Sequence, residues 1–379
     1  MTTAEPLDEL RRRSSAKWSM YPPDVLPLFV AEMDFPLAPP IAARLHELVE
    51  RSDTGYIGSK DELVAAFAGF AAERWDWRVD PERVFTTTDV SVTIVESLRA
   101  SIEPGDGVIV TPPVYPPFFD LIPEAGGAVV QVPLLDDDAR GYRLDIDGID
   151  QAFTAGARAL LLCNPHNPLG LVHEAETLRA LAQVAARHGA TIVSDEIHGP
   201  LTHSDARFSP YLSVSDEARQ TGIAVTAASK GWNVAGLKCA LFVAASDEMT
   251  RRLASMPYEV AFRTSIFGLH ASAVAYGQCA GWLDETVSTI EANRRLLADL
   301  LAEHLPGVGY REPRAGYLAW LDLRSRGLGD DPAEAILERA RVALSSGPGF
   351  GAQGRGFARI NIGCAPDVLE EAVRRIAAI

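Results

Sequence analysis

Apolar residues recur in short runs along the middle of the chain, between residues 105 and 245. Most runs are followed by turn-forming residues and then by a segment in which apolar residues keep helical spacing. This alternation is typical of a mainly parallel sheet covered by helices on both faces. The predicted strands are Val108–Thr111, Ala128–Val132, Ala159–Cys163, Thr191–Ser194, Ile223–Ala227 and Ala240–Ala244, and the predicted helices are Pro117–Ala125, Ile146–Ala155 and Glu174–His188.

The pattern changes on both sides of this block. Residues 1–30 are polar and then rich in proline, which predicts an extended arm, and a helix opens at Pro39 and Pro40. After about residue 275 a long helix, Trp282–His304, leads to a short strand, Ala358–Asn361, and a final helix. We therefore expect three parts: the arm with the first helix, packing with the small domain (1–50), a large domain (51–275) and a small C-terminal domain (276–379).

Composition narrows the class of protein. The chain has 379 residues, of which 47% are hydrophobic and 23% charged, as in a water-soluble globular protein. The net charge of −16 argues against binding to nucleic acid or to anionic membranes. No apolar run is long enough to span a membrane, and no secretory signal precedes the arm. The four cysteines are far apart, which predicts buried free thiols in a reducing cytoplasm, and the histidines show no metal-binding spacing.

Lys230 occupies a position that is typical of a reactive lysine, at the end of a predicted buried strand. The apolar run Ile223–Ala228 ends at Ser229 and Lys230, so Lys230 lies at the mouth of a buried strand. Burial lowers the pKa of a lysine, and a neutral amine can attack a carbonyl carbon, for example that of pyridoxal phosphate. The alternative is an ordinary surface lysine at a strand end.

The segment Ser229–Lys238 reads Ser-Lys-Gly-Trp-Asn-Val-Ala-Gly-Leu-Lys. It resembles the lysine segment of fold-type I pyridoxal-phosphate enzymes, and most closely the MalY/PatB group of carbon–sulfur β-lyases in the class I/II aminotransferase family. Trp232 stands where that group usually has Phe, and Ala227 where many relatives have a phosphate-binding Ser. The resemblance implies a PLP-dependent transferase-like α/β fold with a smaller α+β domain, and pyridoxal 5'-phosphate linked to Lys230.

An acidic residue follows another predicted strand. Asp195 lies at the carboxyl end of the run around Val193, where an open α/β sheet faces its ligand crevice. The resemblance, carried by Ser194–His198, assigns Asp195 to the cofactor's ring nitrogen; a helix-capping acid is the alternative. His198 is expected to lie beside Asp195 and order its carboxylate, although a plain loop histidine is equally compatible with the sequence.

Three more residues are assigned by their motifs. Cys163–Gly170 contains two Asn-Pro pairs, and the resemblance places its second asparagine, Asn167, at the phenolic oxygen of the cofactor. Tyr115, in a proline-rich loop after a strand, matches the aromatic residue that stacks on the pyridine ring. Arg359 matches the arginine that binds the substrate α-carboxylate through a bidentate fork.

Phosphate needs donors and positive charge. Thr86–Asp89 offers a helix N-cap, so the amides of Val90 and Ser91 would lie at a helix start that can hold a phosphate. Further candidates are the hydroxyl of Ser229 and the amine of Lys238. Tyr56, in the glycine-flanked loop Thr54–Gly58, resembles the tyrosine that reaches the phosphate of the neighbouring subunit, which implies a homodimer with shared active sites.

The resemblance implies β-elimination from a cysteine S-conjugate such as cystathionine, an amino-acid substrate, to give a thiol, pyruvate and ammonia. An aminotransferase is the nearest alternative, because both reactions share the steps up to the carbanion. A regulatory binding protein that keeps the fold is an alternative of another class. A dinucleotide enzyme is disfavoured, because the G-x-G-x-x-G match at 349–354 follows no predicted buried strand.

Overall fold

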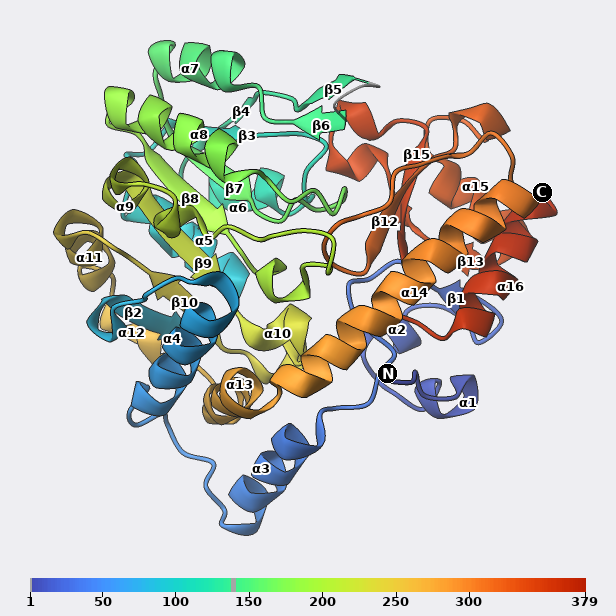
Figure 1. Cartoon of the computed structure of the whole chain (residues 1–379), viewed down its shortest axis with the longest axis horizontal. Helices are drawn as coiled ribbons and strands as arrows, with labels where there is room; N and C mark the ends of the chain where they lie inside the picture. The colour runs from blue at the N-terminus through green and yellow to red at the C-terminus, as the bar shows by residue number, and fades with distance from the viewer. Residues whose placement is uncertain (1, 138–140) are drawn as a thin grey trace.

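The computed structural model describes residues 2–137 and 141–379. Its large body is built on a sheet with the strand order β2-β10-β9-β8-β7-β3-β4 (Figure 1). Strand β10 is antiparallel to both of its neighbours, and the other neighbouring strands are parallel, which confirms the predicted mainly parallel sheet. In this order the strands span Val84–Thr87, Ala240–Val243, Gly222–Thr226, Thr191–Asp195, Ala157–Cys163, Gly107–Val110 and Ala128–Gln131.

Both faces of this sheet are covered, which explains why its strands are almost continuously apolar. On β7, Leu160 and Leu162 pack into the apolar cluster that includes Leu181 of α8. The alternate residue Leu161 joins the second cluster, with Ile94 of α5. Helices α7 (Ile146–Thr154), α8 (Ala175–His188) and α9 (Asp216–Thr221) contribute to the first cluster, and α5 (Val90–Arg99), α6 (Phe118–Glu124) and α11 (Asp247–Ala254) to the second.

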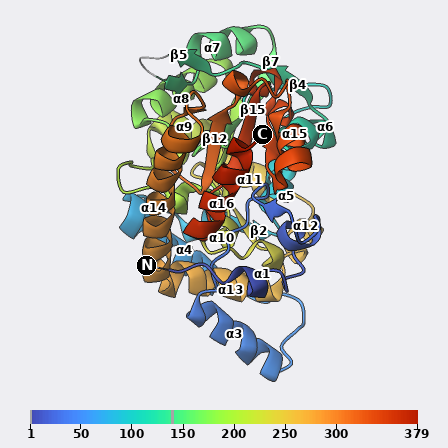
Figure 2. The same ribbon diagram turned by 90° about the vertical axis from the view of Figure 1, so that its right-hand side faces the viewer.

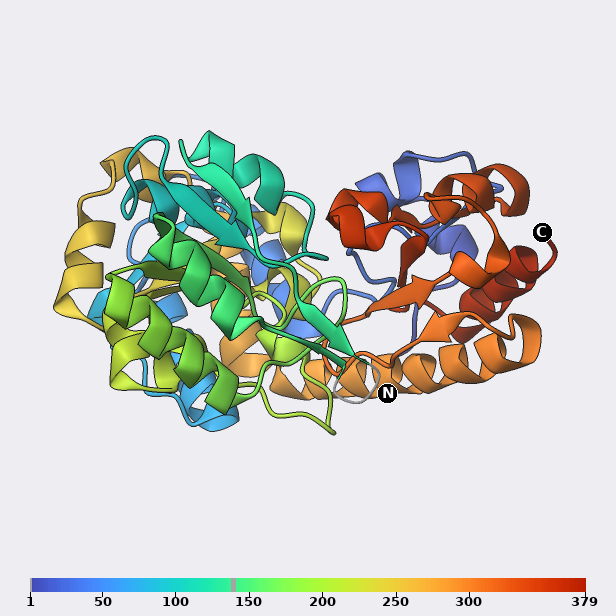
Figure 3. The same cartoon turned by 90° about the horizontal axis from the view of Figure 1, so that it is seen from above.

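A smaller body holds the C-terminal part of the chain. Its antiparallel sheet has the order β11-β12-β15-β14, and the bounds are Gly309–Tyr310, Leu318–Asp322, Phe357–Asn361 and Ser345–Ser346. Helices α15 (Pro332–Ala340) and α16 (Pro366–Ala377) lie with this sheet (Figure 2). The long helix α14 (Ala280–His304) runs from the large body along the small one (Figure 3).

The N-terminal arm is more structured than an extended segment, so that part of the prediction was wrong. It forms short helices α1 (Leu7–Leu10) and α2 (Ala16–Ser19), and strand β1 (Leu26–Pro27) pairs in parallel with β13 (Val342–Ala343). The polar composition of the arm indicated an exposed segment, but one of its charged residues, Lys17, is buried in an ion pair with Asp34. The arm thereby becomes part of the small body's core.

The remaining helices complete the large body. Helices α3 (Pro39–Glu50) and α4 (Asp61–Trp75) pack on α13 (Ile266–Gln278), and α12 (Tyr258–Phe262) lies near β2. A hairpin of β5 (Leu135–Asp137) and β6 (Gly141–Arg143) was not predicted. All four cysteines are buried and free, as predicted. The domain boundaries at residues 51 and 276 stay predictions.

The large body's packing can be tested at Trp232, which is fully buried between Phe70 and Tyr276 and donates from Nε1 to the Cys279 carbonyl at 3.1 Å. Trp232→Ala should lower the free energy of unfolding by about 3–5 kcal/mol, because it leaves a cavity. Trp232→Phe should lower the free energy of unfolding by less, since phenylalanine keeps most of the ring.

Urea unfolding followed by circular dichroism measures both variants. The exposed Val49 supplies a control, because Val49→Ala should change the free energy by less than about 0.5 kcal/mol. A similarly small effect of Trp232→Ala would contradict the packing described here.

Candidate active site

The predicted site residues meet in a cavity of about 180 Å³ at the carboxyl edge of the large sheet. Strands β2, β3, β7, β8 and β9 all end at this edge, and the antiparallel β10 begins there. This is where open α/β sheets bind ligands. The predicted residues that line the cavity are Val90, Ser91, Tyr115, Asn167, Asp195, His198, Ser229, Lys230 and Lys238.

Lys230 lies in the single-turn helix α10 (Ala228–Gly231), directly after β9. Its Nζ donates a hydrogen bond of 2.9 Å to the carbonyl oxygen of Ala31 in the arm. Burial, together with the positive charge of Arg359, lowers the pKa of Lys230 to about 8, against the opposing effects of Glu32 and Asp195. The amine is therefore neutral far more often near neutral pH than that of an ordinary lysine, and the neutral form can act as a nucleophile or a base.

Asp195 is a buried carboxylate at the end of β8. Its Oδ1 accepts a hydrogen bond of 3.1 Å from the amide of Ile197, and burial raises its pKa to about 7, although the charge of Lys230 opposes this. A buried carboxylate with so high a pKa favours a cationic partner, such as a protonated ring nitrogen.

His198 lines the same cavity but does not order Asp195 through a hydrogen bond. In the described part of the chain its Nδ1 has no hydrogen-bond partner, and the amide of Ile197 serves Asp195 instead. Burial lowers the pKa of His198 to about 3, so the imidazole is neutral. It therefore offers an uncharged polar group to whatever fills the cavity.

Arg359, on β15 of the small body, reaches across to the large one. It donates from Nη1 to Oδ1 of Asn167 at 3.0 Å and from Nη2 to the Phe29 carbonyl and the Ser345 hydroxyl, each at 2.9 Å. It forms no ion pair with any carboxylate of the described residues. Because Oδ1 of Asn167 accepts from Arg359, the amide group of Asn167 remains available as a donor.

Another part of the cavity lining, at the start of α5, suits an anion. Val90 and Ser91 begin α5, whose first turn leaves backbone amides without partners inside the helix. Asp89 caps this helix by accepting from the Val92 amide at 3.1 Å, and its other carboxylate oxygen pairs with Nζ of Lys238, also at 3.1 Å. Ser229 lines the same cavity. Lys238 thus lies at the helix start that was expected to hold a phosphate.

Tyr56 lies outside this cavity. Its side chain is 84% exposed, and its ring centroid lies 6.1 Å from that of Phe262. Tyr258, also exposed, contacts Phe262 as well. In this chain alone Tyr56 therefore faces solvent.

These groups fit pyridoxal 5'-phosphate. The cavity places a buried amine, a carboxylate that favours a cationic partner, and helix-start amides with a lysine at separate points along its wall. The unpartnered Nδ1 of His198 is a further polar atom that a ligand can satisfy.

Sequence reasoning missed several groups at the site. Thr88 and Cys163 line the cavity, and the Ala31 carbonyl holds Lys230. A backbone carbonyl has no signature in residue type, so nothing in the sequence indicated this contact.

The comparisons with known proteins agree with this geometry. The family model described as "Aminotransferase class I and II" matches residues 23–376, so the chain belongs to that family. A cystathionine beta-lyase of Corynebacterium glutamicum is 37% identical, over 98% of each chain. The cystathionine beta-lyase PatB of Bacillus subtilis is 34% identical, over 94% of this chain and 92% of its own.

A solved structure shows the same fold. Cystalysin of Treponema denticola, whose structure contains pyridoxal 5'-phosphate, aligns with a TM-score of 0.92 at 26% identity, covering 100% of this chain and 97% of its own. The predictions of family, fold, cofactor and carbon–sulfur lyase class are thus confirmed at the level of the family. Among the described residues, every helix is too short or too polar to span a membrane.

The lowered pKa of Lys230 predicts how the apoprotein captures its cofactor. The rate of pyridoxal phosphate capture should rise with pH around a midpoint near 8, well below the ordinary lysine value of 10.5. The neutral amine is the reactive form, so capture should slow as the pH falls through that midpoint. Borohydride trapping followed by peptide mass spectrometry should place the label on Lys230. A label on another lysine would contradict the assignment, and Lys60, whose own pKa burial also lowers, is the internal control.

Proposed function

We propose that this protein catalyses β-elimination from cysteine S-conjugates such as cystathionine, with pyridoxal 5'-phosphate held on Lys230. The observation that carries the proposal is the convergence of Lys230, Asp195 and the Asn167–Arg359 pair at one buried crevice. The similarity to named relatives alone would support only the carbon–sulfur lyase class. The convergence supplies separate groups for proton transfer, for the cofactor and for the substrate carboxylate.

Each group has one task in this proposal. Arg359, which lacks a carboxylate partner among the described residues, binds the substrate α-carboxylate through its guanidinium. Asn167 orients that guanidinium through its Oδ1, and its amide group donates to the cofactor's phenolic oxygen. The substrate amine would displace Lys230 from the cofactor, and the freed amine of Lys230 would then remove the proton from Cα as the general base, helped by its lowered pKa.

The bound cofactor supplies an electron sink for the carbanion at Cα. Asp195 sustains that sink, because its carboxylate holds a proton on the ring nitrogen. Tyr115 would stack on the ring, and the neutral imidazole of His198 would lie beside it. The phosphate is bound by the Val90 and Ser91 amides, the Ser229 hydroxyl and Lys238, with Asp89 holding Lys238 in place.

The bond changes balance with water as the one further reactant. The Cα proton passes to Nζ of Lys230, the Cβ–S bond breaks, and its electron pair leaves with sulfur as a thiolate that takes up a proton. The released 2-aminoacrylate tautomerises and reacts with water to give pyruvate and ammonia. A buried crevice favours this course because it limits the access of water to the carbanion.

We further propose a cytoplasmic homodimer with shared sites. The exposed aromatic side chains of Tyr56 and Tyr258 support a subunit contact there, because large exposed apolar groups mark interaction surfaces. Tyr56 of one subunit would then reach the phosphate held by the other. The net charge of −16 and the free cysteines support a location in the reducing cytoplasm.

Product analysis tests the reaction. Purified holoenzyme should form pyruvate from L-cystathionine without any added 2-oxo acid, with one free thiol released per pyruvate. Asp195→Asn, which is nearly isosteric, should lower this rate by more than about tenfold, because losing the ion pair to the ring nitrogen costs more than about 1.4 kcal/mol. A lactate-dehydrogenase assay for pyruvate and a thiol reagent measure the two products. Turnover that requires a 2-oxo acid would instead establish an aminotransferase.

Subunit complementation tests the shared site. Lys230→Ala and Tyr56→Ala homodimers should each be weak, since each lesion affects both sites. In a mixed dimer one site carries both lesions and the other neither, so activity should recover to about half of wild type per heterodimer. Mass spectrometry of the intact dimers verifies subunit exchange. The control is Val49→Ala, which also changes an exposed residue. Its homodimer should be as active as wild type, so mixing it with Lys230→Ala should give no activity beyond what Val49→Ala has alone. If verified mixed dimers recover nothing, Tyr56 and Lys230 serve the same site from one chain.

A further inference from the structure

The arm segment 29–34 lies between the two bodies of the molecule and contacts two cationic side chains at the site, Lys230 and Arg359. Its Phe29 carbonyl accepts from Arg359, and its Ala31 carbonyl accepts from both Lys230 and the hydroxyl of Tyr317, the latter at 2.9 Å. Two backbone oxygens of one short segment thus hold the two groups that bind the substrate and move its proton. The placement of this segment fixes the distance between them.

Two buried side chains hold the segment from outside the site. Asn361 donates from Nδ2 to the carbonyls of Val30 and Glu32, at 2.8 and 2.6 Å, which flank the Ala31 carbonyl on both sides. Its Oδ1 accepts from the Gly363 amide at 2.7 Å, so the amide group is fully used. Asn361 stands two residues after Arg359 on β15, and residues so spaced lie on the same face of a strand.

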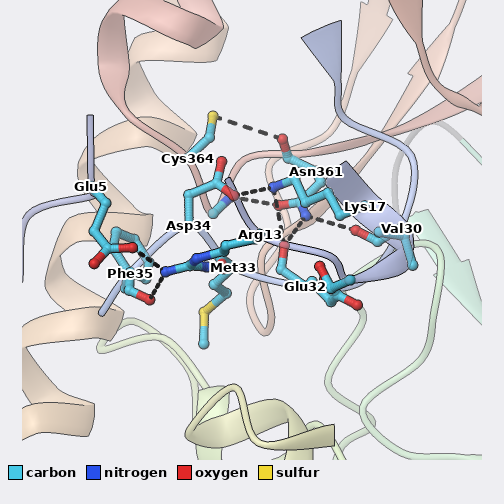
Figure 4. A network of polar contacts seen from close by, with 12 residues as sticks. Glu5, Arg13, Lys17, Val30, Glu32, Met33, Asp34, Phe35, Asn361 and Cys364 are labelled. Atoms are coloured by element: carbon cyan, nitrogen blue, oxygen red, sulfur yellow. Dashed lines mark hydrogen bonds and ion pairs between the residues drawn. The ribbon is translucent and has the colours of Figure 1, made fainter. Parts of the chain in front are cut away.

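Lys17 holds the same segment from the arm's own helix α2. Its Nζ lies 2.7 Å from Oδ1 of Asp34 and donates to the Glu32 carbonyl at 3.2 Å (Figure 4). The side chains of Lys17 and Asp34 are 0% and 1% exposed. We call Lys17, Asp34 and Asn361 the arm clamp.

A buried ion pair is a weak source of stability, because desolvation of both charges offsets their attraction. Its best-attested use is to fix one arrangement among several. Here the arrangement that is fixed is the course of the arm segment past Lys230. The large body contributes one matching contact, since Asn233 exchanges two hydrogen bonds with the backbone of Met33, at 2.9 and 2.8 Å.

We propose that the arm clamp consists of positioning residues that hold the Phe29 and Ala31 carbonyls against Arg359 and Lys230 and keep water away from the Lys230 amine. This inference rests on the proposed function only for the roles of Lys230 and Arg359. None of the clamp residues lines the cavity, so they act through the arm segment rather than by touching substrate.

The inference predicts a particular change at Lys230. Desolvation is the main cause of its lowered pKa, so a loosened arm that admits water should raise that pKa toward the ordinary lysine value. A loosened arm should also weaken substrate binding, because Arg359 would lose the Phe29 carbonyl that orients it. A role in stability alone would produce neither effect.

The main test removes both clamp charges at nearly constant volume with the double variant Lys17→Met/Asp34→Asn. The matched control is Asp24→Asn/Arg341→Met, which removes another ion pair between the arm and the small body, at 2.7 Å but exposed to solvent. Apoproteins are incubated with pyridoxal phosphate across a pH series and trapped with borohydride, and the label on Lys230 is quantified by mass spectrometry. The holoenzymes are titrated with L-cystathionine by the change in cofactor absorbance.

In the clamp variant the midpoint of Lys230 labelling should move to higher pH, and the half-saturating concentration of cystathionine should rise by at least about fivefold. The control variant should match wild type in both measurements. A clamp variant whose melting temperature falls while both readouts stay at the wild-type values would overturn the proposal, and so would a midpoint that moves to lower pH.

If the double variant does not fold, Asn361→Ser replaces it. Serine keeps a buried polar group, but its hydroxyl is too short to reach both the Val30 and Glu32 carbonyls. The same two readouts should shift in the same directions, and an unchanged pair would again overturn the proposal. Failure of the role proposed for Lys230 is separately visible, because wild-type protein would then carry no label on that residue, whereas failure of the lyase reaction alone would appear as missing pyruvate in the product analysis.

Discussion

Two buried cations define this molecule. Burial lowers the pKa of both Lys230 and Arg359, and the charge of Arg359 lowers that of Lys230 further. Neither side chain forms an ion pair with a carboxylate of the described residues. Uncompensated charge in a protein interior is costly, and the cost falls when a suitable anion binds. The crevice is therefore built to be completed by ligands. In the proposed function, a substrate carboxylate at Arg359 would supply the negative charge that the surrounding residues lack.

The overall charge of the chain makes this local arrangement more informative. At a net charge of −16 the protein as a whole repels anions, yet the cavity gathers Lys230 and Lys238, with Arg359 beside it. Positive side chains concentrated in a crevice of an acidic protein point to a specific anionic ligand rather than to general adhesion to polyanions. The carboxylate of Asp195, which also lines the cavity, adds a place for a cationic nitrogen. Together they describe a ligand with separate anionic and cationic ends.

The sequence predicted the parts of this site that follow regular strands. Lys230, Asp195 and Asn167 each come directly after an apolar run, so the topology of a parallel sheet brings them to one edge. Arg359 could be assigned only by resemblance, because a short strand in a separate body carries no signal of what it faces. The buried state of Lys17 was not predictable at all, since a lysine in a polar segment is ordinarily exposed. Two-residue strands such as β1 and β13 are defined by their pairing partner and not by their own periodicity.

The choice of a backbone carbonyl to hold Lys230 has a consequence for its chemistry. A carboxylate at hydrogen-bonding distance would favour the ammonium form and raise the pKa of the lysine, so the amine would seldom be free to react. The Ala31 carbonyl orients Nζ but carries no net charge, and burial is then left to lower the pKa to about 8. Orientation and basicity are thus set by different parts of the structure, the arm and the surrounding core. The role proposed for Lys230, to bond a carbonyl carbon and later to remove a proton, requires this separation, because a charged partner that oriented Nζ would also keep it protonated.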